Sequence, residues 1–109
     1  ELATDYGLTR ETMQWFWQQY IDGATADGQY VKLASVNLAG SPPSHVITAE
    51  YDVLRDEGED FAQRLEQAGV PTTSKRYAGM LHGFVHFGAV FDDAQTAARD
   101  IAKTLDEIT

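Results

Sequence analysis

The feature that most constrains the fold of this sequence is a strand–helix–strand pattern in its second half. His45 to Glu50 is apolar with little alternation, as expected of a strand that is buried on both faces in a parallel sheet. Apolar residues then recur at helical spacing up to Gly69, which predicts a helix that ends at a glycine cap. Thr72 to Tyr77 is rich in β-formers but polar, which predicts an exposed edge strand. This order predicts a right-handed βαβ unit, and therefore an α/β fold.

Two helices are expected to flank these strands. Asp56 is expected to begin the first, and Glu59 to complete a capping box with it. Asp92 is expected to begin a last helix that runs to about Ile108, because its apolar residues share one face. Two parallel strands are too few for an independent sheet of this kind. We therefore expect residues 41–109 to complete a larger α/β sheet, whose other strands belong to an N-terminal remainder of the same protein.

Residues 1–40 are expected to form a separate helix-and-loop segment. Thr9 is a suitable N-cap for a helix that runs to about residue 20. One apolar face of this helix carries residues at helical spacing: Met13, Phe16, Trp17 and Tyr20. Trp15 lies off that face, and glycine and proline residues mark 22–43 as a loop. The simplest interpretation of the aromatic residues is ordinary packing, and the alternative is a pocket wall for an apolar substrate.

The composition disfavours several classes of partner. The 109 residues carry a net charge of −9, with 17 acidic and 8 basic side chains. Nucleic acids and anionic membrane surfaces both attract clustered Lys and Arg, so we expect neither as a partner. No apolar run approaches the ~20 residues of a transmembrane helix, and no signal peptide is recognisable, so we expect a soluble protein and, by default, the cytoplasm. The absence of cysteine excludes disulfides and thiolate metal sites within these residues.

Asp52 and His82 are the residues whose positions indicate chemistry. Asp52 follows the first predicted strand, and His82 lies on an expected loop, Ala78 to Gly83, after the second. In open α/β sheets ligands bind at the carboxyl ends of the strands, so both side chains are expected at one edge. A histidine can act as a base near neutral pH, and a carboxylate that accepts its other N–H fixes the tautomer. An acid followed by a histidine, with a serine earlier in the chain, is the order of the α/β-hydrolase triad.

A metal site is the alternative for the same residues. His82 and His86 are four positions apart, and Asp52 or Glu50 can be imagined as a third ligand. Gly83 separates the histidines within a loop, and the carboxylates have a better use in a triad. We therefore expect no metal.

Several motifs, in order and at compatible spacing, resemble the C-terminal third of the hormone-sensitive-lipase-like esterases of the α/β-hydrolase fold. The segment around Leu8-Thr9, Met13, Trp15 and Phe16 is also similar to this family. The densest part of the resemblance comprises Pro42-Pro43, Thr48-Ala49-Glu50-Tyr51-Asp52, Leu54-Arg55-Asp56-Glu57-Gly58, Ala68-Gly69-Val70 and Gly79-Met80-Leu81-His82-Gly83-Phe84.

The resemblance implies a serine carboxylesterase with Asp52 as the triad acid and His82 as the triad histidine. Such enzymes hydrolyse short- to medium-chain carboxylic esters through an acyl-serine and need no cofactor. Their serine lies in a Gly-Asp-Ser-Ala-Gly-type turn and their oxyanion hole in a His-Gly-Gly-type loop, and neither motif occurs in these 109 residues. We therefore expect both motifs in the N-terminal remainder.

The resemblance also implies roles outside the triad. Trp15, Trp17 and Tyr20 are expected to line the acyl pocket or its lid, so residues 1–40 would contribute to the cap. Thr72 to Tyr77 is expected to pair with a second copy in a homodimer. Two departures from the family stand out: Val53 occupies a position usually held by proline, and the loop before Pro42 lacks a Ser-Pro-Leu stretch.

Two other functions stay open. A peptidase or lactonase on the same fold would use the same acid and base. A non-catalytic interaction module with a degenerate hydrolase fold would be recognised by the loss of the upstream serine.

Overall fold

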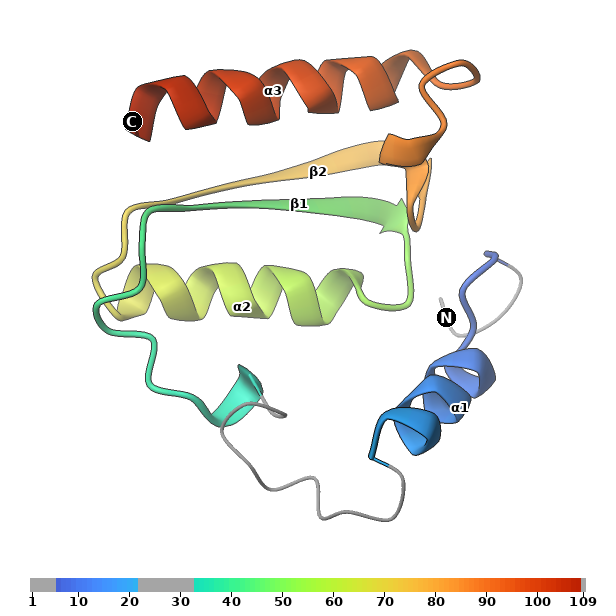
Figure 1. Ribbon diagram of the computed structural model, residues 1–109, viewed down its shortest axis with the longest axis horizontal. Helices are drawn as coiled ribbons and strands as arrows, with labels where there is room; N and C mark the ends of the chain where they lie inside the picture. Colours follow the sequence, from blue (N-terminus) through green and yellow to red (C-terminus); the bar gives the residue numbers. More distant parts are fainter. Residues whose placement is uncertain (1–5, 22–32, 109) are drawn as a thin grey trace.

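The computed structural model describes residues 6–21 and 33–108. Two parallel strands lie between helices α2 and α3, and the 3-10 helix η1 and helix α1 lie beyond α2 (Figure 1). The predicted α/β class, with two parallel strands and flanking helices, is confirmed. The elements in chain order are α1 (Arg10–Ile21), η1 (Leu33–Ser35), β1 (Ser44–Tyr51), α2 (Arg55–Gln67), β2 (Thr72–Leu81), η2 (Phe84–His86) and α3 (Asp92–Ile108).

The two faces of the sheet pack against different helices. Because side chains alternate along a strand, Val46 and Ile47 point to opposite faces. Val46 joins a cluster with residues of α2 and its flanking segments, while Ile47 and Ala49 join a cluster with α3. The first cluster is centred on Leu38, Leu65 and Val70, and the second on Ala49, Tyr77, Phe84, Ala94 and Ala97. The strands are therefore sandwiched between helices, as expected for strands buried on both faces.

Helix α2 ends in the predicted glycine cap. Gly69 has a φ of 78°, and its N–H donates to Glu66 O at 2.9 Å, while Val70 N–H donates to Leu65 O at 3.0 Å. These two bonds define a Schellman motif, which requires a left-handed residue at Gly69. Leu65 and Val70 also pack together in the α2-side cluster, so the cap and the core support one another.

The predicted capping box at the start of α2 is wrong. The helix begins at Arg55, so Asp56 lies inside its first turn, and the N-cap residue Leu54 makes no side-chain cap hydrogen bond. Instead, Asp52 Oδ1 accepts the N–H of Leu54 at 2.9 Å, a turn in which an aspartate caps the backbone two residues ahead. Glu59 faces the sheet and binds strand residues, which removes it from the helix terminus.

Strand β2 is longer than predicted. We expected a strand over Thr72 to Tyr77 and a loop from Ala78, but the strand continues to Leu81 and the turn begins at His82. Gly79 adopts a φ of 74° within the strand, so this glycine marks an irregularity in the pairing and not an end. Strand β1 extends the predicted segment by one residue at each end.

Helix α1 forms behind its predicted cap. Thr9 Oγ1 accepts the N–H of Thr12 at 3.2 Å, and the helix runs one residue beyond Tyr20. None of its residues is buried: on the predicted apolar face Met13 is half-buried, while Phe16, Trp17 and Tyr20 are exposed within the described residues. Part of the predicted loop, residues 22–32, lies outside the described ranges. Arg64 of α2 holds the segment after it, with hydrogen bonds of 2.9 and 3.0 Å to the carbonyls of Leu33 and Val36.

None of the helices within the described ranges combines the length and the apolar character that a membrane span requires.

Glu59 connects α2 to both strands. Its Oε1 accepts the Thr48 hydroxyl of β1 at 3.1 Å, and Arg76 of β2 donates Nε and Nη2 to its two carboxylate oxygens at 2.6 and 2.5 Å. The hydrogen bonds from Arg76 are the largest cause that lowers the pKa of Glu59; the Thr48 hydroxyl lowers it further, while burial opposes both.

This network predicts an acid-dependent loss of stability. A carboxylate with a lowered pKa in the folded state stabilises the protein above its ordinary pKa of about 4.3, and this contribution is lost as the pH falls through the lowered value. Glu59→Gln should therefore reduce the free energy of unfolding by a constant amount between about pH 7 and about pH 5, and by less below about pH 4. Urea unfolding of both proteins across this range measures the difference. A difference that grows on acidification would contradict this role.

Candidate active site

The structure brings Asp52 and His82 together at the carboxyl ends of the two strands. Asp52 directly follows β1 and His82 directly follows β2. His82 Nδ1 lies 2.8 Å from Asp52 Oδ2. An ionised carboxylate can only accept a hydrogen bond, so Nδ1 carries the proton and donates it. In this tautomer the second ring nitrogen, Nε2, is the basic one.

The carboxylate of Asp52 is held from two directions. Oδ2 accepts from His82, and Oδ1 accepts the N–H of Leu54 at 2.9 Å. The Asp52 side chain is 11% exposed and the His82 side chain 45% exposed. The turn that follows Asp52 contains Val53 and Leu54. The acid is therefore buried and oriented, while the imidazole is accessible to a reactant.

The residues after His82 anchor its backbone. Gly83 has a φ of 74°, which favours glycine, and its carbonyl accepts the N–H of His86 at 3.0 Å. The next residue, Phe84, is buried against Tyr77 and α3, with ring centroids of Phe84 and Tyr77 5.1 Å apart. His82 is thus fixed between the end of a strand and a buried aromatic residue.

The other two histidines do not join this pair in a metal site. Within residues 6–21 and 33–108, no group of three His, Asp or Glu side chains is placed to hold a metal ion. His45 lies near the opposite end of β1, where its Nδ1 is 2.6 Å from Thr73 Oγ1.

Trp15, Trp17 and Tyr20 are exposed on α1, at 55%, 40% and 69% of their surface.

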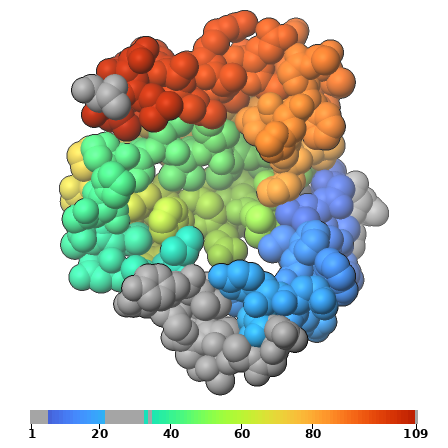
Figure 2. Space-filling model, in the orientation of Figure 1, coloured from blue at the N-terminus to red at the C-terminus, as the bar shows by residue number. Residues whose placement is uncertain are grey.

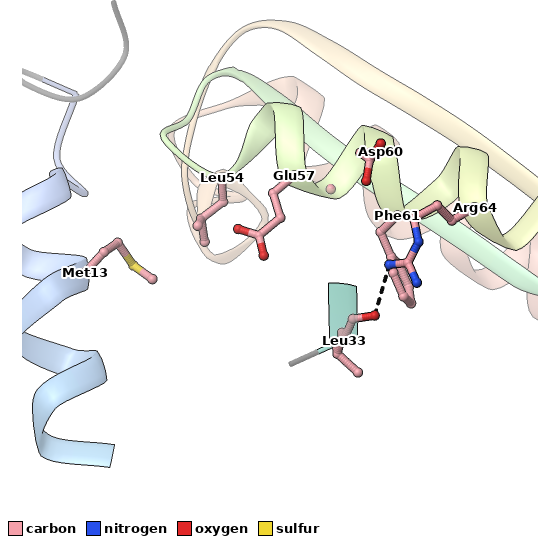
Figure 3. Close-up of a pocket in the computed structure, with 8 residues that line it drawn as sticks. Met13, Leu33, Leu54, Glu57, Asp60, Phe61 and Arg64 are labelled. Atoms are coloured by element: carbon pink, nitrogen blue, oxygen red, sulfur yellow. Dashed lines mark hydrogen bonds between the residues drawn. The ribbon is translucent and has the colours of Figure 1, made fainter. Parts of the chain in front are cut away.

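A cavity of about 380 Å³ lies between α1, η1 and α2, but of α1 only Met13 lines it (Figure 3). Its other lining residues are Leu33, Leu54, Glu57, Gly58, Asp60, Phe61 and Arg64. In the space-filling view α1 and α3 lie on different sides of the molecule (Figure 2). The stacked rings of Tyr6 and Tyr51, 5.0 Å apart, connect the residues before α1 to the end of β1. The role of Trp15, Trp17 and Tyr20 in an acyl pocket stays a prediction.

Sequence reasoning missed the contribution of Glu50 and Gly79. The N–H of Gly79 donates to Glu50 Oε2 at 2.7 Å, a contact between the ends of the two strands close to Asp52 and His82. The signal was present, because an isolated glycine inside a β-rich segment indicates a bulge. The expected loop from Ala78 to Gly83 includes this glycine, whereas in the structure Gly79 lies within β2.

Comparison with known proteins identifies the family. A family described by the alpha/beta hydrolase fold matches residues 1–86. An ethyl acetate hydrolase from Pseudomonas putida is 30% identical over 107 residues, which cover 96% of this chain and 34% of the relative. An arylesterase from Saccharolobus solfataricus is 49% identical over 53 residues, which cover 49% of this chain and 17% of the relative.

Solved structures give the same result. A hyperthermophilic esterase from Pyrobaculum calidifontis has a TM-score of 0.85 and 36% identity over 94% of this chain and 35% of its own. A thermostable esterase from Pseudomonas putida ECU1011 has a TM-score of 0.71 and 46% identity over 76% of this chain and 27% of its own. The chain spans about a third or less of the length of these relatives. The chain therefore belongs to the alpha/beta hydrolase fold family and, within it, to the hormone-sensitive-lipase-like esterases.

Proposed function

We propose that this chain supplies the catalytic acid and base of a serine carboxylesterase, with Asp52 as the acid and His82 as the base. The observation that carries this proposal is the 2.8 Å contact between a buried carboxylate and an accessible imidazole at the carboxyl ends of two parallel strands. The nucleophilic serine and the oxyanion hole would come from other residues of the full-length protein, since no Gly-x-Ser-x-Gly turn occurs in this sequence.

In this mechanism His82 Nε2 accepts the proton of the serine hydroxyl as the serine oxygen attacks the ester carbonyl. The carboxylate of Asp52 stabilises the imidazolium that forms and holds its orientation through Nδ1. His82 then gives the proton to the leaving alkoxide, which departs as the alcohol and leaves an acyl-serine. In the second half His82 accepts a proton from water, the hydroxide attacks the acyl carbon, and the serine recovers the proton as the carboxylic acid is released.

The proposed substrates are carboxylic esters with short to medium acyl chains. Support comes from relatives that are described as an ethyl acetate hydrolase and an arylesterase. No cofactor is required, because the chemistry needs only a nucleophile, a base, its orienting acid and an oxyanion site. A homodimer through Thr72 to Tyr77 also stays a prediction. The contact would use the edge of β2 that does not pair with β1.

A substrate panel on the full-length protein tests the proposal. We expect turnover of p-nitrophenyl acetate and butyrate with much lower kcat/KM for the palmitate ester, and covalent labelling of one serine by a fluorophosphonate, as expected of an acyl-serine enzyme. Labelling together with faster turnover of a peptide or a lactone would assign a different hydrolase on the same fold. A full-length protein with no serine in the nucleophile turn, no labelling and no turnover would instead be an interaction module.

A further inference from the structure

We propose that Glu50 is a positioning residue for His82: its carboxylate fixes a bulge in β2 that brings the histidine into register with Asp52. This inference rests on the proposed function, because it assigns Glu50 an effect on the base of that reaction. It concerns a residue that touches neither the substrate nor the reacting atoms.

The first observation is a change of register between the strands. Ala49 pairs with Tyr77, and Tyr51 pairs with Leu81. Between these pairs β1 advances by two residues while β2 advances by four. The residues that follow the second pair are Asp52 and His82, so the shifted register places them opposite one another.

The size of the register shift shows how it brings Asp52 and His82 together. Without the two additional residues of β2, Asp52 would lie opposite Met80 and not His82. A parallel strand rises about 3.3 Å per residue, so His82 would lie roughly 6 to 7 Å farther along the strand direction. A hydrogen bond of 2.8 Å between the two side chains depends on the bulge.

The second observation is what holds the bulge in place. A residue inserted into a ladder leaves its backbone groups without strand partners, so these groups must bond to a side chain or to water. Gly79 lies in the inserted stretch with a φ of 74°, a region that favours glycine. Its N–H donates to Glu50 Oε2 at 2.7 Å, a short bond to a charged acceptor.

Glu50 is itself held at the end of β1. Arg55, at the start of α2, donates Nη1 to the backbone carbonyl of Glu50 at 3.0 Å. The backbone that carries the carboxylate is therefore tied to the turn that carries Asp52. The contact Glu50–Gly79 thus links the end of one strand, close to the acid, to the end of the other, close to the base.

The test is a set of single variants in the full-length protein, assayed with p-nitrophenyl butyrate. Glu50→Ala removes the acceptor, and we expect kcat to fall by about 10- to 100-fold with KM within about threefold, because misplacement by about 1 Å costs a base about that much. Glu50→Gln keeps an oxygen that accepts the Gly79 N–H, so we expect it to recover most of the lost kcat. Glu66→Ala, which removes an exposed carboxylate at the far end of α2, is the matched control and should leave kcat unchanged.

The outcomes separate this inference from the proposed function. A Glu50→Ala variant with wild-type kcat, beside an inactive His82→Ala variant, would overturn the positioning role and leave the esterase proposal intact. Equal losses in Glu50→Ala and Glu50→Gln would also overturn it, because the charge and not the hydrogen bond would then matter. Full activity of His82→Ala would overturn the proposed function and this inference together.

Discussion

Replacing His82 with alanine is expected to lower kcat of the full-length protein for p-nitrophenyl butyrate by about 10⁵- to 10⁶-fold, with a much smaller change in KM. Removing the base from a serine hydrolase leaves a hydroxyl that is a weak nucleophile at neutral pH, while the binding site is preserved. Within the part of the chain that the structure describes, the imidazole is 45% exposed, so its removal leaves little buried volume empty there. Steady-state kinetics with a melting curve for each protein measures both effects.

His86→Ala is the matched control for this variant. His86 lies four residues along the same segment, in η2, and is also exposed, so its replacement removes an equivalent side chain without touching Asp52. We expect its kcat within about threefold of the wild type, as for surface substitutions away from the reacting groups. Equal losses in the two variants would indicate that the segment matters as a whole and that His82 is not the base.

Asp52→Asn is expected to lower kcat by about 10⁴-fold while the fold is retained. The asparagine Oδ1 can still accept the N–H of Leu54, which keeps the turn into α2. The amide nitrogen would then face His82 Nδ1 as a donor, which favours the tautomer with the proton on Nε2. A histidine in that tautomer cannot accept the proton of a serine hydroxyl through Nε2.

Asp56→Asn provides the comparison for Asp52→Asn. Its side chain is 80% exposed in the first turn of α2, next to Arg55, and it does not cap the helix. The same chemical change at this position should leave kcat unchanged. Measuring kcat from about pH 6 to about pH 9 would show whether a higher hydroxide concentration restores activity to Asp52→Asn while leaving Asp56→Asn unaffected. A full rate for Asp52→Asn would remove this aspartate from the mechanism.

The sequence predicted those elements whose signals are local. The Gly69 cap, the Thr9 cap and the long last helix were all predicted, because capping residues and apolar spacing act within one or two turns. The capping box failed for a reason outside the local sequence. Glu59 has the right spacing from Asp56, but a bidentate contact with Arg76 of β2 holds it against the sheet.

The meeting of Asp52 and His82 was predictable in outline, since the carboxyl ends of parallel strands share an edge. Their register was not predictable. The glycine at position 79 indicates a bulge, but no local pattern gives the size of the two-residue shift in β2 or identifies Glu50 as the partner of the Gly79 N–H. Similarly, spacing identified an apolar face on α1 but could not say what covers it. Tertiary contacts of this kind decide how far along a strand a side chain is placed.

The most direct test of the Asp52–His82 pair is nitrogen NMR of the full-length protein labelled with ¹⁵N-histidine, with the His82 signals assigned by their loss in His82→Ala. We expect the neutral ring to carry its proton on Nδ1, with a downfield N–H resonance that disappears in Asp52→Asn. A neutral His82 protonated on Nε2, or one that averages between tautomers and is indifferent to the replacement of Asp52, would contradict an acid–base pair at this edge of the sheet.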